Sequence, residues 1–328
     1  MKITPKFNRF LLTLSAVSFG CVHQSGYAAA FQLWEQDGAS VGNYHAGRAA
    51  SAEDASTSWY NPAGLVRIKN QQMVLGLVPV VTDIKFRGTV SVLDDNDTPP
   101  VPQTAPMPVV AQGGNFNLIP DLHYAAPIND RWVFGMSVVA PFGLATDYGS
   151  STVARYVATR TALTVVDIAP SLAFAVTDRF SVGAGLDAEH ARAEFDLYAT
   201  EVTGAGELAT NMDTFSENTG NSWGYGYHLG ALYQFSEKTR VGVGYQSKIT
   251  QHLRGSSKFT GPLASDNVFQ ESKDLKTSLT LPATTTVSLF HTVNTVWDVM
   301  STVSYTQWNA IQQMILQNAS GIVLEEND

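Results

Sequence analysis

The residues best suited to chemistry are histidines, and the six of the seven that lie after residue 28 are scattered along the chain. His45, His123, His190, His228, His252 and His291 do not form a metal-ligand spacing. A Gly-x-Ser-x-Gly nucleophile motif does not occur. We therefore predict no catalytic residue, no metal site and no cofactor. If the protein is nevertheless an enzyme, the alternative is a lipid hydrolase of the outer membrane, with a Ser and a His on the wall of a β-barrel.

The first 28 residues have the features of a secretory signal peptide. Three basic residues precede Phe10 to Phe19, an apolar run too short to span a bilayer as a stable helix. Small residues then lead to an expected cleavage after Ala28. The only cysteine, Cys21, lies inside this segment, and a lipid anchor there is the alternative. After cleavage the chain has no cysteine, which excludes disulfides and thiol chemistry.

Charge and hydropathy narrow the class of protein further. The mature chain has seventeen basic and twenty-nine acidic residues, a net charge of −12, which argues against nucleic acid as a partner. No stretch after residue 30 approaches the roughly twenty apolar residues of a membrane helix. Two classes remain: a secreted β protein, or a β-barrel in the outer membrane of a Gram-negative bacterium.

Residues 223–235 decide between these classes. Every second residue from Trp223 to Phe235 is apolar, and aromatic residues gather at both ends. The other face is rich in glycine, with His228 and Gln234. Apolar residues toward lipid, small or polar residues toward the lumen and aromatic residues at the two interfaces are typical of a membrane barrel. We therefore predict an all-β, antiparallel transmembrane barrel that crosses the membrane many times.

The predicted connections alternate between short and long. Short turns are expected near 129–130, 177–178, 237–238 and 294–295, and long loops at 94–115, 148–160, 198–221 and 251–274. This alternation matches short periplasmic turns and long outer loops. About ten strands are expected, at 71–88, 116–127, 131–147, 161–176, 179–197, 222–235, 239–250, 275–291, 296–309 and, more weakly, 311–319.

Residues 29–70 precede these strands and lack their alternation. This segment contains Ala46-Gly47-Arg48-Ala49-Ala50, Asp54-Ala55-Ser56 and Asn61-Pro62-Ala63. It resembles the N-terminal hatch of the outer-membrane long-chain fatty acid transporter family, often called FadL, which includes the TodX-like transporters of aromatic hydrocarbons. The predicted domains are thus a signal at 1–28, a hatch at 29–70 and a barrel at 71–328.

Further matches to this family follow in order along the chain. They lie at 120–130, 142–146, 191–193, 223–226, 281–282 and 305–308. The resemblance implies a barrel of fourteen strands plugged by the hatch. A hydrophobic substrate would be captured among the outer loops, here 201–220 and 251–274, and would leave sideways through the wall.

The resemblance places this exit at a kink in the third strand, at Pro141, Phe142, Gly143 and Leu144. Pro141 cannot donate a ladder hydrogen bond, and glycine tolerates unusual backbone angles. Together they would interrupt strand pairing and open a gap toward lipid. The alternative is a simple bulge at the outer rim of a barrel.

The resemblance also suggests site residues outside the kink. Phe31 is expected near the ligand, where it either plugs the path or anchors the hatch, and Asn61, Pro62 and Ala63 are expected to shape the hatch. Family members carry a basic residue where this chain has Leu197. Arg192 is the nearby candidate for binding a carboxylate, so both long-chain fatty acids and neutral aromatic hydrocarbons remain possible substrates.

The remaining expectations concern partners and completeness. Outer-membrane lipids and lipopolysaccharide should surround the barrel, and the full-length protein should be a monomer. A passive structural porin is another alternative, against which the hatch argues. Because about ten strands are visible and the sequence stops at Asp328, we predict a C-terminally truncated chain. An open sheet in lipid leaves backbone groups unpaired, so this chain should not form a stable closed monomer.

Overall fold

The computed structural model describes residues 31–91, 93–94, 101–102, 105–203, 207–265, 271–311 and 316–317. The predicted signal peptide, with Cys21, lies outside these residues. So do parts of the predicted loops 94–115, 198–221 and 251–274 and part of the predicted strand 311–319.

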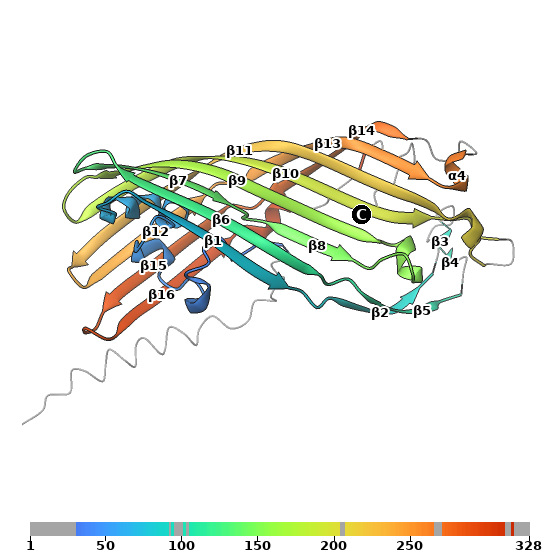
Figure 1. Cartoon of the computed structure of the whole chain (residues 1–328), viewed down its shortest axis with the longest axis horizontal. Coiled ribbons are helices and arrows are strands. Elements are labelled where there is room, and N and C mark those ends of the chain that lie inside the picture. Colours follow the sequence, from blue (N-terminus) through green and yellow to red (C-terminus); the bar gives the residue numbers. More distant parts are fainter. Residues whose placement is uncertain are drawn as a thin grey trace, which may run out of the picture. The chain divides into compact units, whose positions relative to one another are not determined.

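One antiparallel sheet contains most of the strands (Figure 1). Its order is β1 (Gln72–Val81), β6 (Phe116–Pro127), β7 (Trp132–Val139), β9 (Arg160–Ala175), β10 (Phe180–Ala199), β11 (Thr214–Ser236), β12 (Thr239–Gln246), β15 (Thr284–Thr292) and β16 (Asp298–Thr306). Off this path, β8 (Gly143–Asp147) pairs with β9, β13 (Ile249–Thr260) pairs with β11, and β14 (Ser272–Leu281) pairs with β13. Within the described residues, β1 and β16 each have one edge without a strand partner.

The predicted alternation of exposed and buried side chains is confirmed on β11. Tyr225 is 75% exposed, whereas His228 on the opposite face is 1% exposed. Leu229 and Tyr233 continue the exposed face, and Leu232 continues the buried one. Among the helices that the structure describes, none has the length and apolar character needed to cross a bilayer. The four short turns predicted from the sequence lie between consecutive strands, as expected.

Two predicted loops are wrong in extent. Residues 198–221 contain the start of β11, which pairs with β10 from Thr214 onward, and residues 251–274 contain most of β13 and the first residues of β14. The start of β11 carries Ser, Thr and Asn across its two faces, and residues 251–260 of β13 are mostly polar, so these parts lack the outward apolar face that lipid imposes. Their polarity therefore predicts loops where the structure has strands. The predicted strand 71–88 spans parts of two strands, because β1 ends at Val81 and β2 (Lys85–Val90) begins after it.

A second, two-stranded sheet pairs the end of the predicted strand 71–88 with part of the predicted loop 94–115. It is formed by β2 (Lys85–Val90) and β5 (Met107–Gln112), and a short pair, β3 (Leu93–Asp94) and β4 (Val101–Pro102), continues it. The remaining elements outside the hatch are short helices: η3 (Val153–Tyr156), η4 (Thr210–Met212), α4 (Pro262–Ser265) and η5 (Trp308–Ala310).

Three predicted strands are each broken into two. The strand 131–147 divides into β7 and β8, 239–250 divides into β12 and β13, and 275–291 divides into β14 and β15. At the first break, Val139 lies opposite Asp167 of β9, whereas Gly143 lies opposite Thr164. The broken strand therefore takes four residue steps while β9 takes three. One extra residue is inserted, as in a β-bulge.

Residues 31–70, the segment predicted as the hatch, contain only short helices: η1 (Val41–Asn43), α2 (Arg48–Ser51), α3 (Thr57–Tyr60) and η2 (Pro62–Arg67). α2 packs on β12 and β15, and η2 packs on β9, β10 and β11. Wall glycines make this contact possible. A Cβ on Gly242 would lie 1.7 Å from the Ala49 carbonyl oxygen, and one on Gly183 would lie 2.5 Å from the Ala63 nitrogen.

Candidate functional site

The break between β7 and β8 leaves one edge of the wall without a neighbouring strand. β6 pairs with β7 as far as the Leu122–Val138 pair, but β8 pairs only with β9 in the described part of the chain. The first residues of the hatch segment occupy this edge. Gln32 forms an antiparallel bridge with Phe142, the Leu33 N–H donates to the Pro141 oxygen (3.0 Å), and the Gly143 N–H donates to the Phe31 oxygen (2.9 Å).

Side chains at this junction form an apolar cluster. The Phe31 ring lies 5.9 Å from the Phe142 ring and 5.9 Å from the Trp308 ring, measured between centroids. Both Phe31 and Leu144 pack against a buried group that includes Phe142, Leu163, Val165, Leu253 and Leu281. A Cβ on Gly143 would lie 2.9 Å from Leu33 Cδ1, so this position holds the hatch segment at close range. The structure thus brings together all four predicted kink residues and Phe31.

A cavity of about 30 Å³ lies beside this junction. Its lining includes the apolar residues Leu33, Phe142, Ile249 and Leu281 and the polar residues Gln36, Arg48, Tyr60, Asp187, Glu189 and Thr286. A volume of this size holds about one water molecule. A larger ligand therefore fits only if neighbouring residues move.

The predicted residues Asn61, Pro62 and Ala63 lie deeper, at the contact between hatch segment and wall. The fully buried Asn61 side chain accepts from the Ala63 N–H (3.1 Å) and donates to the Ala49 oxygen (2.5 Å) and the Ala231 oxygen (3.0 Å). None of the three lines the cavity. Their geometry is that of a helix cap that also fastens η2 to the wall.

Arg192 is placed apart from these residues. Its neighbours Ala191 and Ala193 on β10 are buried, so alternation puts the exposed Arg192 side chain on the outer face. It does not line the cavity. The structure therefore does not bring together Arg192 and the Phe31–Phe142 cluster.

Arg48 is the basic residue that does line the cavity, and the sequence analysis did not single it out. Its Nη2 donates to Thr286 Oγ1 (3.3 Å) and Ser304 Oγ (2.9 Å). Its guanidinium carbon lies 4.6 Å from the Trp34 ring centroid and 5.3 Å from that of Tyr60. Burial lowers the pKa of Arg48 below its ordinary value. Arg48 lies in a segment that resembles the family. Its hydrogen-bond partners, however, lie on β15 and β16, which are distant in the sequence.

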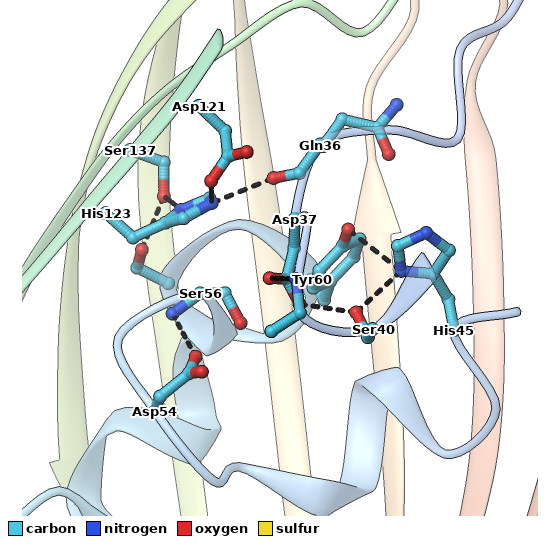
Figure 2. Close-up of polar contacts among 12 residues, drawn as sticks. Gln36, Asp37, Ser40, His45, Asp54, Ser56, Tyr60, Asp121, His123 and Ser137 are labelled. Carbon is cyan, nitrogen blue, oxygen red and sulfur yellow. Dashed lines mark hydrogen bonds and ion pairs between the residues drawn. The ribbon is translucent and has the colours of Figure 1, made fainter. Parts of the chain in front are cut away.

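A Ser–His–Asp group occurs on β6 and β7 (Figure 2). His123 Nδ1 lies 2.9 Å from Ser137 Oγ, and Nε2 lies 2.8 Å from the Gln36 carbonyl oxygen and 3.5 Å from Asp121 Oδ1. Because a carbonyl only accepts, Nε2 carries the proton. Ser137 Oγ also meets Ser58 Oγ at 2.5 Å. Both Ser137 and His123 are fully buried and neither lines the cavity, so the group fastens hatch to wall without room for a substrate.

A second polar group lies within the hatch segment itself (Figure 2). Ser40 Oγ donates to Asp37 and lies 2.8 Å from His45 Nδ1, which is also 3.2 Å from the Tyr60 hydroxyl. Burial, and then the charge of Arg48, lower the pKa of His45. Burial raises the pKa of Tyr60 well above its ordinary value. His45 and Tyr60 are therefore neutral at pH 7. The described residues contain no group of three or more His, Cys, Asp or Glu side chains suited to a metal ion.

Comparison with known proteins supports the same architecture. The chain is 26% identical to the long-chain fatty acid transport protein of Escherichia coli K12, over 96% of this chain and 75% of the relative. It is 28% identical to outer membrane protein P1 of Haemophilus influenzae, over 94% and 72% of the two chains. A 47 kDa outer membrane protein of Pasteurella multocida is 29% identical, over 97% and 75%.

Solved structures share the fold. A Pseudomonas aeruginosa FadL homologue superposes with a TM-score of 0.74 at 21% identity, covering 88% of this chain and 72% of that one. The Pseudomonas putida toluene transporter TodX gives 0.54 at 18% identity, covering 80% and 69%. A model of the family described as outer membrane protein transport protein (OMPP1/FadL/TodX) matches residues 19–327. The chain is an outer-membrane β-barrel protein that belongs to this family.

Proposed function

We propose that this protein admits hydrophobic small molecules, chiefly long-chain fatty acids, through the outer membrane, and that they leave sideways at the break between β7 and β8. The observation that carries this proposal is the bridge between residues 31–33 and residues 141–143. Through this bridge, the hatch segment occupies part of the edge at which the strand that follows β6 has lost its pairing with β6. Moving residues 31–33 would free this edge and enlarge the adjacent cavity at the same time.

An apolar exit is physically reasonable for an acyl chain. Burying apolar surface contributes about 0.8 kcal/mol per CH₂ group, so a water-filled pore is a poor path for such a molecule. The cluster around Phe31 and Phe142 offers an apolar surface next to lipid. First capture at the outer loops, contact with lipopolysaccharide and a monomeric state are further parts of the proposal.

A neutral aromatic hydrocarbon is the second candidate substrate. It is supported by the likeness to the toluene transporter TodX and by the position of Arg192, which is not available to a carboxylate in the cavity. A passive porin and a lipid hydrolase are less well supported. The hatch segment packs on seven strands of the wall, from β6 to β15, and Ser137 is fully buried.

The test is to remove the extra residue of the bulge. Deleting Pro141 makes the registers of β7 and β8 on β9 continuous and removes the residue that cannot donate to a ladder, so β8 can pair toward β6. Labelled oleate and toluene are offered to Gram-negative host cells that lack a protein of this family. We expect the wild type to take up oleate faster than control cells do, and the deletion to abolish this gain.

A deletion of Ser150 is the matched control, because it shortens the loop beyond β8 by one residue and leaves the bulge intact. Both variants are compared at equal amounts in the outer membrane. Full uptake by the Pro141 deletion would reject the lateral exit. Uptake of toluene alone would select the second substrate.

A further inference from the structure

We infer that Arg48 is the residue that binds the carboxylate of the transported molecule. Once movement of residues 31–33 enlarges the cavity, it holds a single-chain amphiphile with its head on the hatch segment and its chain toward Phe31 and Phe142. This inference rests on the proposed function and adds the recognition site to it. It also replaces Arg192, whose side chain lies on the outer face.

The first support is that the positive charge of Arg48 is buried without a counter-charge. Arg48 is 9% exposed, and it makes no ion pair with a carboxylate of any described residue. Its acceptors among the described residues are two neutral hydroxyls, both bonded through Nη2. Nε and Nη1 have no hydrogen bond to the described part of the chain. A buried cation is costly unless it is paired, so a ligand carboxylate would supply what the protein leaves out.

The second support is that the guanidinium is held in place for a planar partner. Trp34 and Tyr60 lie within cation–π distance of it, and Thr286 and Ser304 fix one nitrogen. The free edge of a fixed guanidinium matches a carboxylate in two-point geometry.

The third support is the chemistry of the two acids in the cavity. Asp187 Oδ1 lies 2.5 Å from His228 Nδ1, and Glu189 Oε2 accepts from Gln251 at 3.3 Å. Both are thus committed to wall residues and leave Arg48 unpaired. The same cavity is also lined by the apolar side chains of Leu33, Phe142 and Leu281. A lining that combines an unpaired cation with apolar side chains suits a fatty acid rather than toluene.

Arg240 shows what a purely structural arginine looks like in this protein. It is equally buried, but it donates to the carbonyl oxygens of Ala50 (2.5 Å) and Ser51 and lies 3.8 Å from the Phe290 ring centroid. It does not line the cavity. Arg240 therefore serves as the matched control for the loss of a buried guanidinium at the hatch.

The experiment compares oleate with oleyl alcohol, which has the same chain and no charge. Binding of each radiolabelled probe to the protein, purified from outer membranes in non-ionic detergent, is measured above a protein-free micelle blank. We expect Arg48→Gln to weaken oleate binding by roughly 10- to 100-fold, the size expected for hydrogen bonds between charged groups. Oleyl alcohol binding should change by less than about twofold. Arg48→Lys should retain most of the preference for oleate.

The outcomes of this experiment distinguish failure of the Arg48 inference from failure of the proposed transport function. Arg240→Gln should affect both probes alike. If Arg48→Gln weakens both probes equally, or neither, Arg48 is not the carboxylate site, while transport of fatty acids stands. If the wild type prefers oleyl alcohol, the inference also fails. If the wild type binds neither probe, the proposed function fails with it. Should Arg48→Gln not fold, the Lys variant and the wild-type preference decide between these outcomes.

Discussion

At the residue scale, protonation of His45 is linked to the stability of the hatch segment. Its Nδ1 is bonded to Ser40 and Tyr60, and its Nε2 is buried without a hydrogen-bond partner among the described residues. A proton on Nε2 would therefore have no acceptor and would lie near the charge of Arg48. This explains why the folded protein resists protonation of this side chain.

This arrangement predicts a pH dependence of hatch stability. The folded pKa of His45 lies below its ordinary value of 6.5, so the unfolded segment binds the proton more readily. Stability is therefore complete above pH 6.5 and falls as the pH drops below that value. Hydrogen exchange of residues 37–50, corrected for intrinsic rates, should be faster at pH 5 than at pH 7.5. His45→Gln should lose this difference, and a pH-independent wild type would contradict the prediction.

At the element scale, the contact between hatch and wall depends on strands that carry glycine on their inner face. Gly242 on β12 touches the Ala49 carbonyl oxygen so closely that no side chain fits. Gly242→Ala should push α2 away from the wall, at a cost of about 1–3 kcal/mol. We expect a larger ion conductance in planar bilayers. Gly220→Ala, where a Cβ makes ordinary contact at 3.5 Å, should behave as wild type. Equal conductance of both variants would argue against hatch packing on this glycine face.

The elements also show which features could be predicted from the sequence. Lipid forces apolar residues onto one face of β9, β10 and the second half of β11, so the sequence predicts these parts within a few residues. Where both faces are polar, as in residues 214–221 of β11, that signal is missing and the sequence predicts a loop. The break at Pro141 was predictable from its own residues and from the family resemblance. The proposed role of Arg48 could not be predicted from the sequence, because it depends on Trp34, Thr286 and Ser304, which only the folded chain brings beside it.

At the scale of the whole molecule, residues 31–33 connect three features. They bridge the break in the wall, they contribute Leu33 to the cavity that Arg48 lines, and their neighbour Gln36 accepts from His123. A displacement of this short segment would therefore change the wall, the cavity and the hatch together. The central claim is that this displacement is required for transport.

A reversible cross-link tests that claim most directly. Gln32 and Phe142 are a directly opposed, non-hydrogen-bonded pair, whose Cα atoms lie about 4.5 Å apart in such ladders, so cysteines at both positions can form a disulfide. The predicted mature chain has no other cysteine. Cysteines at Thr250 and Thr280, opposed on β13 and β14, provide the control cross-link. We predict that oxidised Gln32→Cys/Phe142→Cys cells take up no oleate above background, that a reductant restores uptake, and that the control pair transports in both states. Full oleate uptake by the oxidised, cross-linked Gln32→Cys/Phe142→Cys protein would contradict the account.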